Sequence, residues 1–196
     1  MIPDIIILCG KKHSGKTEVA KVIATKIGRY SIVKESDPVK KMVYEFLIAR
    51  GCNAEIAREY SHGSLKDTPT RYFNMKTSRD MQKAMCEAFR AMDEDFIAIV
   101  AADKVEEHIA SGGQVIIDDV RDKREISMIA DVARRRNASM VKLWVYDPCN
   151  IHNNDHHITE TRVSAVDCDA EILNLKTGTD DLCSVTRTVL NSLSML

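Results

Sequence analysis

The chain has 196 residues, of which 44% are hydrophobic and 29% charged, which is ordinary for one compact domain with a substantial core. Its 28 Lys and Arg residues nearly balance 29 Asp and Glu residues, so the formal net charge is −1. We see no basic tail or stripe, which argues against a nucleic-acid polymer as partner. Any anion that binds here must therefore be held by a local group of residues.

The sequence also bears on where the protein works. The short apolar run near the N-terminus has no positively charged leader, and the longest later apolar stretch, residues 96–102, is far shorter than a membrane span. The six cysteines are scattered and include no Cys-x-x-Cys pair, which predicts reduced thiols and no zinc site. We therefore expect a cytoplasmic protein that binds no membrane; its oligomeric state, a homodimer included, is left open.

Short apolar runs alternate with helical patterns along the chain. Residues 5–9 form an unbroken apolar run, typical of a central parallel strand that is buried on both faces. The later predicted elements are, in order, a helix with Val19, Ile23 and Ile27 on its inner face, a strand at 30–33, a helix from Asp37-Pro38, helical residues 78–110 broken near Asp93, a strand at 115–117 that ends in Asp118-Asp119, a helix from Ile126 to Arg136, strands at 140–146 and 172–173, and a helix from Leu182 to Leu193. Between residues 51 and 77 the pattern fades into a polar stretch. This alternation predicts a three-layer α/β fold with a central parallel sheet of about five strands flanked by helices.

The segment between the first strand and the first helix carries the strongest motif. Residues 10–17 read Gly-Lys-Lys-His-Ser-Gly-Lys-Thr and fit G-x-x-x-x-G-K-[ST], the phosphate-binding P-loop. Its glycines let backbone N–H groups point at phosphate oxygens, its lysine places a cation on the β and γ phosphates, and its threonine hydroxyl binds Mg²⁺. The motif predicts a site for ATP and Mg²⁺ formed by Gly10, Lys12, His13, Ser14, Gly15, Lys16 and Thr17.

A second group of charges follows a later strand. Asp118 and Asp119 end the 115–117 run, at the sheet edge where parallel strands present ligand sites, so one of them can lie beside the magnesium ion. Arg121 can hold a second phosphate or neutralise charge on the group in transfer; solvated charges at a strand end are the alternative. Lys40 and Arg79 are further cationic candidates. No base for a neutral hydroxyl acceptor stands out, and a phosphate acceptor needs none.

The polar segment at 147–169 admits two interpretations. Asp155-His156-His157, with His152 nearby, suggests a metal site, but the residues are crowded and no second cluster has ligand spacing. We prefer a mobile lid that covers ATP.

Taken in order, these motifs resemble the phage-type deoxynucleoside monophosphate kinases. The similar pieces are residues 7–17, Asp37-Pro38-Val39-Lys40, Arg79-Asp80-Met81-Gln82, Asp119-Val120-Arg121 with Glu125, residues 155–160 and Ile172-Leu173-Asn174. The resemblance implies a P-loop kinase fold and transfer of the ATP γ-phosphoryl group to a deoxynucleoside 5′-monophosphate with Mg²⁺, in the host cytoplasm for a viral protein. It also implies an acceptor-binding helical region at about 37–110 and a lid at about 147–169.

The same resemblance implies roles for individual residues. Lys16, Asp119, Arg121 and Arg79 would act in catalysis, with Thr17 and Asp119 at the metal and Asn174 at ATP. Lys40, Arg79 and Arg121 would lie near the acceptor phosphate or the transferring group, and His157 and Glu160 would bind substrate from the lid region. The sequence departs from the family at residues 50–77, which show no recognisable nucleobase pocket, and in having Glu18 after Thr17.

Two alternatives stay open. The animal-type phosphomevalonate kinases share the phosphate loop and the D-x-R strand end, although the His-Ile-Thr-Glu piece at 157–160 favours the nucleotide kinases. A P-loop regulatory module that binds ATP without a small acceptor is the other alternative. The sequence has neither the N-K-x-D nor the L-S-G-G-Q signature of such modules.

Overall fold

The computed structural model describes residues 2–34, 36–118, 120, 122–150 and 163–193. They form two compact units, one made of Met1–Glu35 with Ala98–Leu196 and the other of Ser36–Ile97. The first unit contains a five-stranded sheet in the order β2-β3-β1-β4-β5, and every neighbouring pair is parallel. Its strands are β1 (Ile5–Cys9), β2 (Tyr30–Lys34), β3 (Gln114–Asp118), β4 (Met140–Tyr146) and β5 (Ala170–Leu173).

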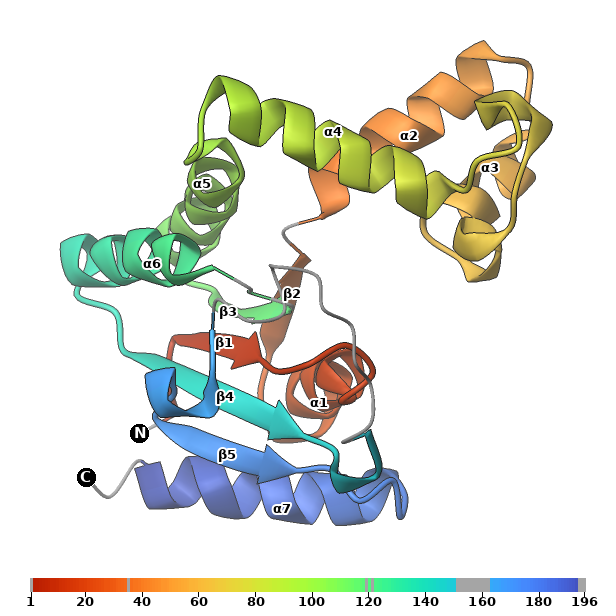
Figure 1. The fold of residues 1–196 in the computed structure, drawn as a ribbon. Coiled ribbons are helices and arrows are strands. Elements are labelled where there is room, and N and C mark those ends of the chain that lie inside the picture. The colour runs from red at the N-terminus through yellow and green to blue at the C-terminus, as the bar shows by residue number, and fades with distance from the viewer. Residues whose placement is uncertain (1, 35, 119, 121, 151–162, 194–196) are drawn as a thin grey trace. The chain divides into compact units, whose positions relative to one another are not determined.

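Helices cover both faces of this sheet (Figure 1). Ile6 and Leu8 of β1 pack with α1 and α7, whereas Ile5 and Ile7 pack with α5 and α6. All four side chains are fully buried, as an unbroken apolar run predicts for a central strand. The helices are α1 (Lys16–Val22), continued by a π-helix at Ile23–Ile27, α5 (Phe96–Ala110), α6 (Lys123–Arg136) and α7 (Thr179–Leu193). The predicted three-layer α/β fold with a parallel sheet of about five strands is confirmed.

The strand order determines where a ligand site forms. β1 lies between β3 and β4, and the chain leaves β1 toward β2 but leaves β4 toward β5. Ligands in open parallel sheets bind at the carboxyl ends of strands where neighbouring connections diverge in this way. The P-loop, which directly follows β1, therefore lies at the expected switch point.

The second unit is helical and has a small core of its own. Val43, Leu47, Cys52, Ala57 and Phe73 form this core. Its helices are α2 (Asp37–Ala49), α3 (Ala54–Ser61) and α4 (Ser78–Met92), with 3-10 turns at Ser64–Asp67 and Arg71–Phe73. The start of α2 at Asp37 and the break between α4 and α5 agree with the sequence-based expectations.

Helix α3 was not predicted. Its buried side chains, Ala57 and Ser61, are small, so the sequence lacks an apolar period that would indicate a helix. The helix begins instead with a side-chain cap: Oδ1 of Asn53 accepts hydrogen bonds from the N–H groups of Glu55 (2.9 Å) and Ile56 (3.4 Å).

The predicted lid at 147–169 is described only at its ends, as 3-10 turns at Pro148–Asn150 and Ala165–Asp167. Residues 151–162 lie outside the described residues, so the lid stays a prediction. None of the helices described has both the length and the apolar character needed to cross a membrane.

Candidate functional site

The P-loop backbone takes a shape that only glycine fits at two points. Gly10 has φ +144° and Gly15 φ +94°, a region that L side chains rarely adopt. A Cβ at Gly10 would lie 2.4 Å from the carbonyl oxygen of Val145, and a Cβ at Gly15 only 2.0 Å from Nδ2 of Asn174. Both glycines of the motif are therefore required by close packing against β4 and the segment after β5.

Polar groups gather inside this loop. Nζ of Lys16 donates to the carbonyl oxygens of Gly10 (2.7 Å) and Lys11 (2.9 Å), which folds the lysine back over the loop. The Ser14 hydroxyl is buried and has no hydrogen-bond partner within the described part of the chain. A buried polar group without a partner is unfavourable, and an incoming phosphate oxygen would satisfy it. The loop therefore fits the phosphates of ATP.

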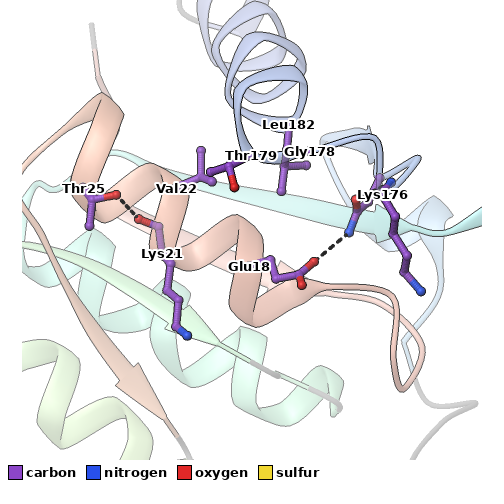
Figure 2. A pocket seen from close by; sticks show the side chains of 9 residues that line it. Glu18, Lys21, Val22, Thr25, Lys176, Gly178, Thr179 and Leu182 are labelled. Carbon is purple, nitrogen blue, oxygen red and sulfur yellow. Dashed lines mark hydrogen bonds between the residues drawn. The ribbon is translucent and has the colours of Figure 1, made fainter.

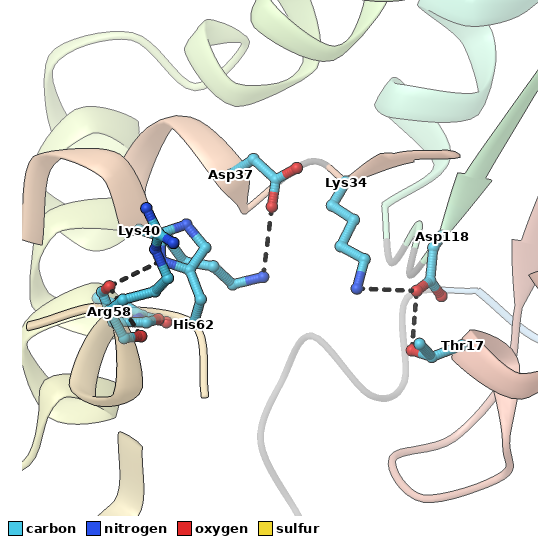
Figure 3. A network of polar contacts seen from close by, with 9 residues as sticks. Thr17, Lys34, Asp37, Lys40, Arg58, His62 and Asp118 are labelled. Carbon is cyan, nitrogen blue, oxygen red and sulfur yellow. Dashed lines mark hydrogen bonds and ion pairs between the residues drawn. The ribbon is translucent and has the colours of Figure 1, made fainter. Parts of the chain in front are cut away.

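A threonine of α1 and an aspartate of β3 form a pair that can hold a metal ion. The Thr17 hydroxyl donates a 2.8 Å hydrogen bond to Oδ2 of Asp118, a residue 101 positions later in the chain (Figure 3). Asp118 is 2% exposed, while Thr17 is exposed. Hydroxyl and carboxylate oxygens are ligands that Mg²⁺ accepts, directly or through its waters. Asp118, one of the two aspartates considered from the sequence, thus lies beside Thr17, and Asp119, the predicted metal ligand, lies outside the described residues.

Sequence reasoning missed a lysine at this point. Lys34 ends β2 and lies opposite Asp118 in the β2–β3 register. Its Nζ is 3.8 Å from Oδ2 of Asp118, the same oxygen that accepts the bond from Thr17 (Figure 3). The signal available in the sequence was its place at the end of a predicted strand, but only the strand order makes β2 the neighbour of β3.

Asn174, which directly follows β5, contacts the P-loop. Its Nδ2 donates to the carbonyl oxygen of Ser14 (3.1 Å) and to Oε2 of Glu18 (3.4 Å), and its Oδ1 accepts from the N–H of Lys176 (3.1 Å). The amide is buried. The contacts described for Asn174 are thus made to the protein, and its predicted role at ATP stays a prediction.

Lys176 also anchors the end of β4. Its Nζ lies 2.6 Å from Oδ2 of Asp147, whose side chain is buried and whose Oδ1 accepts from the N–H of Cys149 (2.8 Å). The hydrogen bond from Lys176, aided by the one from Cys149, holds the pKa of Asp147 below its usual value. The same contact raises the pKa of Lys176. This pair ties the β5–α7 loop to the residue at which the predicted lid begins.

A pocket of about 330 Å³ lies beside this network (Figure 2). It is lined by Glu18 and Lys21 of α1, by Asn174, and by Lys176, Gly178 and Leu182 of the β5–α7 region.

Two of the three predicted acceptor cations, Lys40 and Arg79, are each paired with a carboxylate inside the Ser36–Ile97 unit. Nζ of Lys40 lies 3.5 Å from Oδ1 of Asp37, and Nη2 of Arg79 lies 3.0 Å from Oδ2 of Asp67. Nε of Arg79 donates to the other oxygen of Asp67, so the guanidinium binds this carboxylate through two nitrogens. That two-nitrogen contact is the kind of grip that arginine also makes on phosphate.

Other predicted site residues fall outside the structure's described part: Arg121, His157, Glu160 and the cluster at His152–His157. Within the described residues, no group of three or more His, Cys, Asp or Glu side chains is arranged to hold a metal ion. Lys12 and His13 lie in the P-loop turn, and His13 has φ +66°.

The sequence matches no family model and no curated protein. Several solved structures have a similar arrangement. A sugar kinase from Janibacter sp. HTCC2649 is 13% identical with a TM-score of 0.49, covering 96% of this chain and 95% of its own. The APS kinase of Mycobacterium tuberculosis is 11% identical (TM-score 0.45, coverage 97% and 98%), and the dephospho-CoA kinase of Campylobacter jejuni is 12% identical (TM-score 0.45, coverage 96% of each chain). Similarity at this level carries no conclusion about the reaction of this chain.

Proposed function

We propose that this chain is an ATP- and Mg²⁺-dependent phosphotransferase that converts a deoxynucleoside 5′-monophosphate to its diphosphate. The observation that carries the phosphoryl-transfer part is the 2.8 Å contact of Thr17 with Asp118. A glycine turn with an ordinary lysine would need no buried carboxylate beside its threonine. A P-loop that binds magnesium nucleotide needs such a carboxylate, because the metal requires oxygen ligands next to the phosphates.

The chemistry fits an acceptor that is itself a phosphate. Such an acceptor is already ionised, so the protein needs to position it and neutralise charge, and needs no strong base. Lys16 supplies a cation at the donor phosphates. Lys40 and Arg79 supply cations whose present partners, Asp37 and Asp67, are carboxylates that an incoming dianion can replace. The choice of a deoxynucleoside monophosphate rests on the resemblance of the D-x-R and His-Ile-Thr-Glu pieces to the phage-type kinases.

An acceptor panel tests the proposal. The protein, with ATP and Mg²⁺, is given each deoxynucleoside monophosphate, each ribose counterpart and phosphomevalonate, and ADP release is measured with the Lys16→Ala protein as the blank. We expect ADP release with at least one deoxynucleoside monophosphate. Activity confined to phosphomevalonate would keep the mechanism and overturn the substrate. ATP hydrolysis that no acceptor accelerates would favour a regulatory module.

Paired variants separate the donor and acceptor sites. Arg79→Lys keeps a charge but loses the two-nitrogen grip, so the acceptor KM should rise about tenfold or more while the ATP KM stays unchanged. Arg134→Lys is the control, since Arg134 of α6 is exposed and pairs with Asp131 (2.8 Å) of the same helix. An unchanged acceptor KM in Arg79→Lys would remove Arg79 from the acceptor site.

A further inference from the structure

Backbone pairing fixes Lys34 beside Asp118. β2 and β3 are parallel neighbours, and Lys34 is the register partner of Asp118 at the last position of each strand. Side chains of register partners lie on the same face of a sheet. That face is the one covered by α1, because Ile116, two residues before Asp118, packs with Val19 of α1. The position of Lys34 next to Asp118 is thus set by the sheet and not by one side-chain rotamer.

The charges at this point are unequally accessible. The Asp118 side chain is 3% exposed, whereas the Lys34 side chain is 35% exposed. A carboxylate so deeply buried is unfavourable unless cations and hydrogen-bond donors compensate it. Nζ of Lys34 lies 3.8 Å from Oδ2 of Asp118, and Thr17 donates to the same oxygen. Lys34 therefore approaches from the solvent side the atom that, with Thr17, can hold the metal.

We propose that Lys34 is a counter-ion of Asp118 in the metal-free protein and competes with Mg²⁺ for that carboxylate. This inference rests on the proposed use of magnesium nucleotide at Thr17 and Asp118. Two cations that share one carboxylate oxygen repel each other, so Lys34 must give up its contact when the metal binds. The long, flexible lysine side chain can do so without moving the strand. Lys34 is thus a positioning residue that holds the Asp118 carboxylate in place before the metal arrives.

The proposed competition predicts that Lys34 weakens binding of the metal, which is opposite to the usual effect of a lysine on binding of the nucleotide. Lysines near a nucleotide site usually strengthen binding of the anion, so their removal weakens it. Removing Lys34 should instead tighten metal binding, because the metal no longer displaces an ion pair. We expect Lys34→Met and Lys34→Gln to lower the dissociation constant for Mn²⁺ roughly tenfold, which corresponds to about 1.4 kcal/mol. Lys34→Arg keeps the charge and should stay close to the wild type.

The experiment measures metal binding without turnover. Mn²⁺ is titrated into the nucleotide-free protein and free Mn²⁺ is followed by electron paramagnetic resonance, for the wild type, the three Lys34 variants and Lys142→Met. Lys142 is a matched control: it lies in β4, its side chain is 24% exposed, and its Nζ is 3.4 Å from Asp169. ADP affinity in EDTA and circular dichroism are recorded for each protein. A second titration follows the rise in unfolding temperature with Mg²⁺ at saturating ADP.

Tighter Mn²⁺ binding in Lys34→Met and Lys34→Gln, with Lys142→Met unchanged, is the expected result. Should one of the two uncharged variants not fold, the other decides. If the wild type binds Mn²⁺ and ADP, the proposed nucleotide and metal site is supported. Unchanged or weaker Mn²⁺ binding in a folded uncharged variant would then overturn the role of Lys34 alone. A wild type that bound neither ADP nor Mn²⁺ would overturn the proposed function, and this inference with it.

Discussion

The packing of Gly15 against Asn174 makes Gly15→Ala an informative change. The backbone of Gly15 has φ +94°, and an added Cβ would lie 2.0 Å from Nδ2 of Asn174 and 3.1 Å from Oε2 of Glu18. Real Cβ atoms do not approach an amide nitrogen so closely, so the Asn174 side chain has to move. It is buried and bonded to the carbonyl oxygen of Ser14, so moving it breaks that hydrogen bond.

Two separate costs follow for the alanine variant. An L residue in the left-handed region costs about 1–2 kcal/mol. Leaving the buried groups of Asn174 and Ser14 unsatisfied costs about 1–3 kcal/mol more. The free energy of unfolding should therefore fall by about 2–5 kcal/mol, or by about 2–4 °C in midpoint for each kcal/mol. Gly112→Ala is the matched control: Gly112 has φ +77° and nothing within 4 Å of an added Cβ, so it should show the backbone cost alone.

Urea unfolding of the nucleotide-free protein measures both variants, and a double-mutant cycle isolates the contact. In an Asn174→Ala background the alanine at position 15 no longer meets the amide, so it should cost only what Gly112→Ala costs. The cycle should thus give a coupling energy of about 1–3 kcal/mol. The reasoning is refuted if Gly15→Ala costs no more than Gly112→Ala and its effect adds to that of Asn174→Ala within about 0.5 kcal/mol.

Two further predictions concern Lys16 and Asp147. Lys16→Ala should keep the native circular dichroism spectrum while turnover with the best acceptor falls at least about 100-fold, because a fixed cation at the donor phosphates is lost; near-normal ADP release would contradict the P-loop assignment. Asp147 has a pKa held below its usual value by the hydrogen bond from Lys176, so its stabilising effect is complete above the ordinary carboxyl pKa of about 3.9 and is lost as pH falls through the lower folded pKa. Urea midpoints between about pH 2 and pH 6 should therefore fall more steeply in the wild type than in Lys176→Met; parallel profiles would show that the pair does not contribute.

The sheet was predictable because its strands are short apolar runs. Residues 5–9 are apolar without interruption, and every side chain of β1 is fully buried. No such period exists for α3, whose buried positions are Ala57 and Ser61, so its helical character depends on the Asn53 cap and on packing with α2. Local patterns thus indicate an element where burial demands large apolar side chains, and fail where small residues meet a core.

The candidate site divides in the same way. The P-loop is continuous along the chain, so its glycines and Lys16 are recognisable from the order of residues alone. The partners of the loop come from far along the chain: Asp118 lies 101 residues after Thr17, and Asn174 lies 160 residues after Ser14. Those contacts depend on which strands become neighbours, which a hydrophobic pattern does not specify.

The position of β3 illustrates how the fold brings together the residues of the candidate metal site. β3 lies between β2 and β1, although the chain passes through the whole Ser36–Ile97 unit after β2 before it returns to form β3. Because β3 lies between β1 and β2, Asp118 pairs with Leu8 on one side and with Lys34 on the other. With β3 at an outer edge instead, Thr17 would have no carboxylate from this strand end and Lys34 would have no buried partner there. The strand order thus brings both the candidate metal ligand Asp118 and the proposed competitor Lys34 to one point. Lys34→Met and Asp118→Asn should therefore interact energetically, whereas Lys142→Met and Asp118→Asn should be additive.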